Sequence, residues 1–203
     1  MKLVTELLLV DCWLVQLPLG ASEIQHEVEL GVVIGSVACC VSEAAAAGHI
    51  GGYALALDMT DRVAQSRAKK SGLPWTLGKA FDTSCPVSRF IDKSSIADPQ
   101  NVELWLDVNG VSRQRASTAD MIFTIPYIIS WISHHMTLEP GDLILTGTPS
   151  GVGSVHAGDH IDCGISDLVT MAFDVESRDW FRLHFAVLLL HCIWGHEMLL
   201  VVA

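Results

Sequence analysis

Alternating apolar and polar positions recur along this chain, and a period of two is typical of β-strands that bury one face. This pattern predicts strands over residues 27–34, 53–58 and 168–176. Residues 102–114 predict a hairpin, because Asn109-Gly110 suits a type I′ turn between two alternating segments. Residues 141–155 predict a further strand that runs into a glycine-rich loop. Strands therefore dominate the expected structure.

Helical signals are fewer and lie between the predicted strands. Thr60 is a candidate N-cap for a helix over residues 61–70, which Gly72 terminates. A second helical pattern covers residues 125–138 and has Pro126 in its first turn. Because strands and helices do not alternate regularly, the sequence predicts a mostly β fold with peripheral helices, of the α+β class.

The two ends of the chain differ from the middle. Residues 23–176 read as one compact unit, preceded by an atypical leader over residues 1–22 and followed by an atypical hydrophobic tail over residues 177–203. Glu6 and Asp11 interrupt the apolar part of the leader, so a core strand or an unusual leader fits better than a secretory signal. Charged residues and histidines also interrupt the tail, and no membrane span is expected.

Charge and cysteine content narrow the classes of function. The net charge of −11 argues against a nucleic-acid-binding surface, since phosphate binding requires clustered Lys and Arg, and it fits a protein that holds cations. The six cysteines include no CxxC pair and no spacing typical of metal ligands. We interpret them as small buried apolar residues in a reducing compartment.

Three carboxylates lie at predicted strand ends. Glu27 and Glu29 are two residues apart, so on a strand they face the same side of the sheet, while His26 faces the other side. A solvated edge strand would explain them, and Asp58 alone could be a helix-capping acid. Together they form a set of hard oxygen ligands, which favours Mg²⁺ or Mn²⁺.

Two further positions are candidates for contact with a ligand. Lys79 lies in an apolar segment, where it is either an exposed lysine with a buried stem or a charge that stabilises an oxyanion. The loop over residues 146–153 lacks the GK[ST] ending of a P-loop. It is either an ordinary turn or a close approach of backbone to a small ligand, with Thr148 offering its hydroxyl.

Five segments occur in an order that resembles the fumarylacetoacetate hydrolase family, in particular its acylpyruvase branch: HEVELGVVIG, HIGGYALALDMTDR, GLPWTLGKAFDTSCPVS, WLDVNGVSRQ and GDLILTGTPSGVG. The resemblance implies a mixed β-roll, a Mg²⁺-dependent site, a homodimer, and a mitochondrial or cytoplasmic location. It implies C–C bond cleavage in acylpyruvates and decarboxylation of oxaloacetate, both small 2-oxo acids. By the same resemblance, the metal ligands are Glu27, Glu29 and Asp58, the catalytic residue is Lys79, and the substrate-binding residues are Arg62, Gln65 and Thr148.

The chain departs from the family pattern at its N-terminal end. The resemblance implies an upstream segment of the type GxNYxxHxxE, whose His–Glu pair activates water, but residues 1–22 contain no histidine. His26 does not replace it, because it faces away from Glu27 and Glu29. We therefore expect hydrolysis to be impaired more than decarboxylation. The alternative is a catalytically inactive metal-binding isoform that pairs with a full-length relative.

Overall fold

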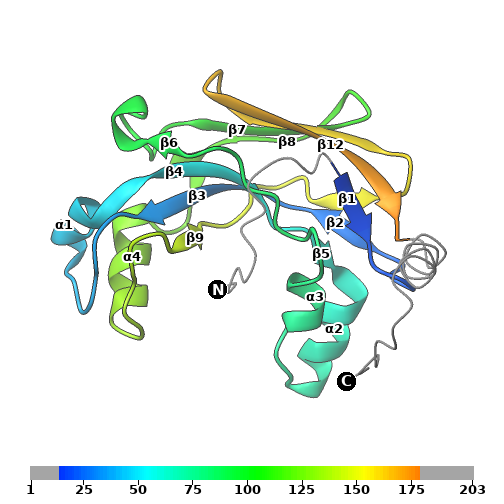
Figure 1. The fold of residues 1–203 in the computed structure, drawn as a ribbon, viewed down its shortest axis with the longest axis horizontal. Helices are drawn as coiled ribbons and strands as arrows, with labels where there is room; N and C mark the ends of the chain where they lie inside the picture. Colours follow the sequence, from blue (N-terminus) through cyan, green and yellow to red (C-terminus); the bar gives the residue numbers. More distant parts are fainter. Residues whose placement is uncertain (1–13, 179–203) are drawn as a thin grey trace, which may run out of the picture.

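The computed structural model describes residues 14–178, and the first part of the predicted leader and most of the predicted tail lie outside them. Strands from three sheets form the body of the molecule, and helices lie at its periphery (Figure 1). The predicted α+β class with dominant strands is confirmed. No helix among residues 14–178 is long and apolar enough to span a membrane.

A four-stranded sheet crosses the centre of the molecule in the order β6-β4-β3-β9. Its strands are β3 (Val28–Ile34), β4 (Ile50–Leu57), β6 (Ile91–Asp92) and β9 (Leu143–Leu145). β3 pairs antiparallel with both β4 and β9, so it is an inner strand of the sheet. This sheet contains the two strands that the sequence predicts over residues 27–34 and 53–58.

A five-stranded sheet packs against it in the order β1-β12-β11-β7-β8. Its strands are β1 (Leu14–Leu17), β7 (Glu103–Val108), β8 (Val111–Ser117), β11 (His160–Ile165) and β12 (Val169–Ser177). The predicted hairpin is confirmed as β7 and β8, and the φ angles of 53° at Asn109 and 72° at Gly110 suit the type I′ turn. β1 lies within the predicted leader and pairs parallel with β12.

A three-stranded sheet, in the order β10-β2-β5, borders the central sheet near Glu27. Its strands are β2 (Ile24–His26), β5 (Thr60–Asp61) and β10 (Gly153–Val155). Only Glu27 separates β2 from β3, and the chain passes there from one sheet to the other. This junction places residues of two sheets around one carboxylate.

Short helices cover the ends of the sheets. They are α1 (Glu43–Ala46), α2 (Arg62–Ser71), α3 (Thr76–Lys79) and α4 (Ile125–Ser133), with 3-10 turns at Ala47–His49, Lys93–Ser95 and Thr118–Asp120. Figure 1 shows α2 with α3 at one end of the central sheet and α1 with α4 at the other.

The start of α2 differs from the prediction. Asp61, not Thr60, is the N-cap, and its Oδ1 accepts a hydrogen bond from the Ala64 amide at 2.9 Å. Thr60 belongs to β5 and donates its hydroxyl to the Asp58 carbonyl at 3.1 Å, so the predicted cap is wrong by one residue. The predicted end is confirmed, because Gly72 adopts the left-handed conformation with φ of 64°.

The core lies between the central and five-stranded sheets. Fully buried side chains of the central sheet include Leu30 and Leu55, and those of the other sheet include Leu106 and Phe173. Burying one such side chain stabilises the fold by about 1.5–3 kcal/mol. The packed core therefore fixes the position of β3. It also fixes the backbone that carries the carboxylates where this strand begins.

Candidate metal centre

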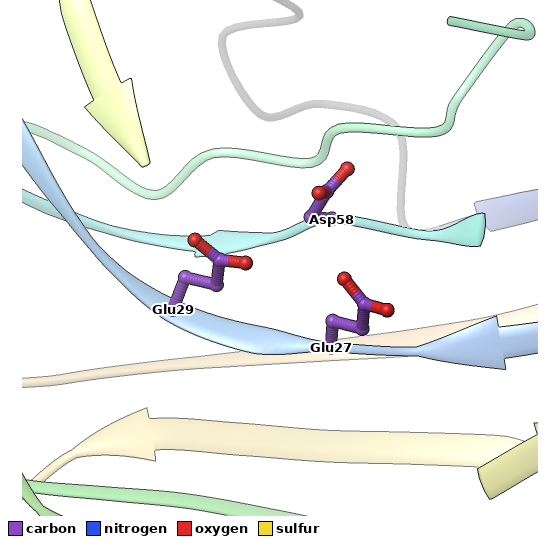
Figure 2. Close-up of side chains that lie close together, drawn as sticks. All are labelled: Glu27, Glu29 and Asp58. Atoms are coloured by element: carbon purple, nitrogen blue, oxygen red, sulfur yellow. The ribbon is translucent and has the colours of Figure 1, made fainter. Parts of the chain in front are cut away.

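Three carboxylates converge where β3 begins and β4 ends. Antiparallel pairing sets Val28 opposite Leu57, and the Asp58 amide donates to the Glu27 carbonyl at 2.8 Å. One ligand oxygen from each of Glu27, Glu29 and Asp58 lies within 4.8 Å of the others. Figure 2 shows the three carboxyl groups close together, with Glu27 and Glu29 extending to the same side of the backbone. The predicted common face of the two glutamates is confirmed; the role of the three residues as metal ligands stays a prediction.

Both glutamates are buried. Glu29 is 4% exposed and Glu27 is 8% exposed, so the alternative of a solvated edge strand is wrong. Burial, followed by the charge of Asp58, raises the pKa of Glu29 from 4.5 to about 7, although the Gly147 amide donates to its Oε2 at 2.7 Å. At Glu29, burial and the negative charge of Asp58 therefore outweigh the nearby positive charge of Lys79.

Lys79 lies directly on the cluster. Its Nζ donates to Glu27 Oε2 and to Asp58 Oδ2, each at 2.7 Å, and its side chain is 18% exposed. Burial opposes its charge, but hydrogen bonds and charge interactions with Asp58 and Glu27 outweigh burial and raise the pKa of Lys79. Lys79 is thus a charged member of the site, and the alternative of an exposed surface lysine is wrong.

Arg62 and Gln65 border the cluster through Glu27. Arg62 Nη2 donates to Glu27 Oε1 at 2.7 Å, its Nη1 donates to Gln65 Oε1 at 2.7 Å, and its Nε donates to Gln25 Oε1 at 2.7 Å. The structure therefore brings these two predicted substrate-binding residues to the first turn of α2, beside the carboxylates. Their contact with a substrate stays a prediction.

Thr148 has two protein partners. Its Oγ1 donates to the Val28 carbonyl at 2.9 Å and accepts from Gln114 Nε2 at 2.8 Å. The glycine-rich loop instead meets the cluster through the Gly147 amide, which binds Glu29. The sequence singled out the loop, but the group that reaches the cluster is a backbone amide.

Gln114 is a buried polar residue that the sequence analysis missed. Its Oε1 accepts from the Val28 amide at 3.2 Å and lies 2.8 Å from His26 Nδ1, while its Nε2 donates to Thr148 and to the Pro149 carbonyl. All the hydrogen-bonding capacity of the amide is used. Gln114 thereby ties the residues on both sides of Glu27 to the loop that binds Glu29.

The register of the hairpin offered a signal for Gln114, since it lies opposite the buried Leu106 in the β7–β8 pair. His26 shares its environment, and burial is the main cause that lowers the pKa of this imidazole. His26 contacts Gln114 and not the carboxylates, which agrees with its expected orientation on the strand.

Glu29 and Asp58 line a cavity of about 940 Å³. Its other walls come from α4, the segment after it and β9, and are mainly apolar. They include Tyr127, Ile128, Trp131, Ile132, Met136, Leu143 and Leu145. A small organic acid fits easily in such a volume, and a cation held by Glu29 and Asp58 would be the group that attracts its carboxylate.

The residues present fit a divalent cation. Carboxylate oxygens are the ligands that Mg²⁺ and Mn²⁺ prefer, and the ligand atoms are already gathered within 4.8 Å. A cation among them would offset the burial and the repulsion by Asp58 that raise the pKa of Glu29. The three carboxylates therefore form a candidate metal centre, and Lys79 lies beside it.

Comparisons with known proteins place this chain in a family. The model of the fumarylacetoacetate (FAA) hydrolase C-terminal domain matches residues 8–176. A human relative, "Oxaloacetate tautomerase FAHD1, mitochondrial", is 54% identical over 164 residues, which cover 81% of this chain and 74% of the relative. "Oxaloacetate decarboxylase, mitochondrial" of Dictyostelium discoideum is 53% identical over 165 residues, which cover 81% of this chain and 76% of the relative.

A solved structure is similar in fold as well as in sequence. The fumarylpyruvate hydrolase from Pseudomonas aeruginosa in complex with Mn²⁺ and pyruvate has a TM-score of 0.78 and 35% identity, and the match covers 80% of this chain and 70% of that one. The expected mixed β-roll is thus confirmed together with the resemblance. On these matches and on its own fold, the chain belongs to the fumarylacetoacetate hydrolase family.

Proposed function

We propose that this chain is a divalent-metal-dependent enzyme of small 2-oxo acids, which decarboxylates oxaloacetate and hydrolyses the C–C bond of acylpyruvates. The observation that carries the proposal is the cluster of Glu27, Glu29 and Asp58 with Lys79 bound to it, at a cavity. The names of the oxaloacetate decarboxylase and fumarylpyruvate hydrolase relatives support it. Relatives named oxaloacetate tautomerases suggest a third reaction of the same substrate, keto–enol interconversion.

Glu27, Glu29 and Asp58 would hold the cation, and Mg²⁺ is the first candidate because all three ligands are hard oxygens. Mn²⁺ is the second, since the Pseudomonas aeruginosa relative was crystallised with it. When bound, the cation supplies Lewis acidity toward the carboxylate and 2-oxo oxygens of the substrate.

The side chains around the cluster would stabilise the negative charge that forms in the reaction and orient the substrate. Lys79 Nζ, held at 2.7 Å from two carboxylates, is charged and stabilises negative charge on an enolate oxygen. Arg62 and Gln65, next to Glu27, orient the carboxylate end of the substrate, and the Thr148 loop limits its position. Loss of carbon dioxide from oxaloacetate requires no further base, because the bonding electrons pass into the enolate.

Hydrolysis requires in addition a base that activates water. Within residues 1–22 no histidine is present, and His26 is bound to Gln114 away from the carboxylates. We therefore propose that this chain lacks the His–Glu lid segment of the family and hydrolyses acylpyruvates weakly. General acid–base catalysis contributes about 10²–10⁴-fold in rate, which is the expected deficit.

The test compares two activities before and after one change. Turnover of oxaloacetate and of acetylpyruvate is measured with and without Mg²⁺, in the native chain and in a chimera with a GxNYxxHxxE segment ahead of Ser22. We expect the graft to raise hydrolysis by about 10²–10⁴-fold and decarboxylation much less. A chimera whose segment carries Ala at the His and Glu positions is the matched control. Equal hydrolysis by native chain and chimera would show that the base lies elsewhere.

The absence of that histidine also favours a second candidate, an inactive metal-binding isoform that pairs with a full-length relative. The same assay separates the candidates. An inactive isoform binds Mg²⁺ but turns over neither substrate, and mixing it with a full-length relative changes the rate of that relative. Metal-dependent oxaloacetate turnover by the isolated chain would exclude this candidate.

We also propose that the protein acts as a homodimer, located in mitochondria as the names of its relatives suggest. Large apolar side chains on α4 and just before it are unusually exposed, with 55% for Trp131 and 91% for Ile122, which supports an interface there. Light scattering should give twice the chain mass. Ile122→Glu with Trp131→Glu should give the mass of one chain, while Val111→Glu, on the remote hairpin, should not change it. One chain mass for the native protein would contradict the proposal.

A further inference from the structure

Two neighbouring thiols are exposed on the segment that joins β3 to α1. Cys39 and Cys40 are free and exposed, whereas Cys85 and Cys163 are buried. The interpretation of the cysteines as buried apolar residues is therefore wrong for the first pair. Neither thiol belongs to the carboxylate cluster, and the proposed function does not use them.

The backbone on both sides of the pair is held in place. Ala38 and Leu138 exchange two backbone hydrogen bonds, at 2.9 and 3.0 Å. The Cys40 amide donates to the Ser133 carbonyl at 2.9 Å, and the Val41 amide donates to Ser133 Oγ at 3.1 Å. The pair is thus presented from a backbone anchored to α4 and to the segment after it. Such preorganisation lowers the entropy cost of binding a ligand through both side chains.

The two thiols interact with each other. The neighbouring Cys39 thiol raises the pKa of Cys40. Cys40 has a φ angle of 52°, in the left-handed region that non-glycine residues rarely occupy. The two thiols are therefore adjacent in the chain and both accessible from solvent.

A direct disulfide suits this pair poorly. Neighbouring Cα atoms across a trans peptide are about 3.8 Å apart, below the roughly 4.4–6.8 Å that disulfides usually span. A single centre bonded to both sulfurs at about 2.3 Å each leaves them farther apart than the S–S bond of about 2.05 Å. Chelation therefore requires less distortion than oxidation.

The number of ligands excludes a closed zinc site. In the part of the chain that the structure describes, the one group of three or more potential metal ligands is the carboxylate cluster, so Cys39 and Cys40 have no third ligand of this kind beside them. A structural Zn²⁺ site requires four ligands. Two thiolates alone suit a soft centre of low coordination number.

We propose that Cys39 and Cys40 form a dithiol site that chelates a soft, low-coordinate centre, of which trivalent organic arsenic is the model case. Phenylarsine oxide is the probe. Each thiol gives up its proton, two As–S bonds replace the As=O bond, and the oxygen leaves as water. Arsenic stays trivalent, so the reaction needs neither oxidant nor reductant.

The experiment uses the reduced full chain with Cys12→Ser and Cys192→Ser, so that the cysteines outside residues 14–178 do not contribute. Intact mass should show one arsenic adduct per chain, and a thiol titration should show the loss of two thiols. Cys39→Ser and Cys40→Ser should each weaken binding by at least about 100-fold, because the second As–S bond is intramolecular. Cys163→Ala, which removes a buried thiol, should bind like the parent.

Cys40→Gly guards against misfolding, since glycine adopts the φ of 52° without strain and should lose binding as Cys40→Ser does. Mg²⁺ binding should be the same in all these variants, so the result does not depend on the proposed enzyme function. No adduct, equal affinity in the single-cysteine variants, or Zn²⁺ binding as tight as the arsenical that is lost in Cys39→Ser would overturn the proposal.

Discussion

Replacing Glu29 with glutamine should lower the affinity for Mg²⁺ and Mn²⁺ by at least about 100-fold, more than the 10–100-fold lost with an outer-shell partner. Glutamine keeps the size of the side chain but removes a carboxylate that lies within 4.8 Å of the two others. Calorimetric titration of the metal into both proteins measures the difference. Glu103→Gln, which changes an exposed strand glutamate of the five-stranded sheet, is the matched control and should bind normally.

The same titration has an expected pH dependence. Because burial and Asp58 raise the pKa of Glu29 to about 7, this carboxyl group is protonated below that pH in the metal-free protein. A proton then competes with the cation, so affinity should fall as the pH drops from 8 to 6, in the region of that pKa. Glu29→Gln has no such proton to displace. Unchanged affinity in this variant, or a flat pH profile in the native protein, would mean that Glu29 is not a ligand.

Lys79→Met should reduce the turnover of any substrate by about 10²–10³-fold, the usual effect of removing one charge aimed at an oxyanion. Methionine keeps most of the length of the side chain but cannot donate to Glu27 or Asp58. Metal affinity should be retained, because Lys79 is a counter-charge of the ligands and not a ligand itself. Steady-state kinetics together with calorimetry separates the two effects.

Lys69→Met is the matched control for this change. Lys69 is exposed in the last turn of α2, on the helix that carries Arg62. This variant should keep the native rate. A native rate in Lys79→Met would show that the charge of Lys79 serves only to pair Glu27 and Asp58. A loss of both metal binding and turnover would show that Lys79 maintains the structure of the site and does not act on the substrate.

Local patterns predicted most of the fold. The alternation of residues 27–34 and the Asn109-Gly110 turn each depend on neighbouring residues, and both are confirmed. The sequence-based predictions failed where two neighbouring residues could both serve as the N-cap. They also failed where a side chain contacts a residue that is distant in the sequence. Thr60 and Asp61 are both good capping residues and both belong to β5, and their side-chain contacts decide between them: Asp61 accepts from the Ala64 amide, whereas the Thr60 hydroxyl donates to the Asp58 carbonyl.

The carboxylates could be predicted because the face of a strand follows from the spacing of its residues, and the burial of Glu29 decides against the solvated alternative. The contacts of Lys79 and Gln114 could not be predicted in this way. Lys79 reaches Glu27 from α3, and Gln114 reaches Val28 from β8, so both contacts depend on tertiary packing.

The parallel pairing of β1 with β12 has a consequence for how the protein folds. It sets Leu14 beside Asp174, almost the full described length of the chain apart, so the loop that it closes is very long. Contacts of such sequence separation form slowly, because closure entropy must be overcome first. During synthesis β1 is made long before β12 and cannot pair with it until β12 has also been made. In that interval Val15, which is fully buried in the finished sheet, is exposed. We expect closure of this sheet to be the last step of folding, and the interval before it to be the time of greatest risk of aggregation.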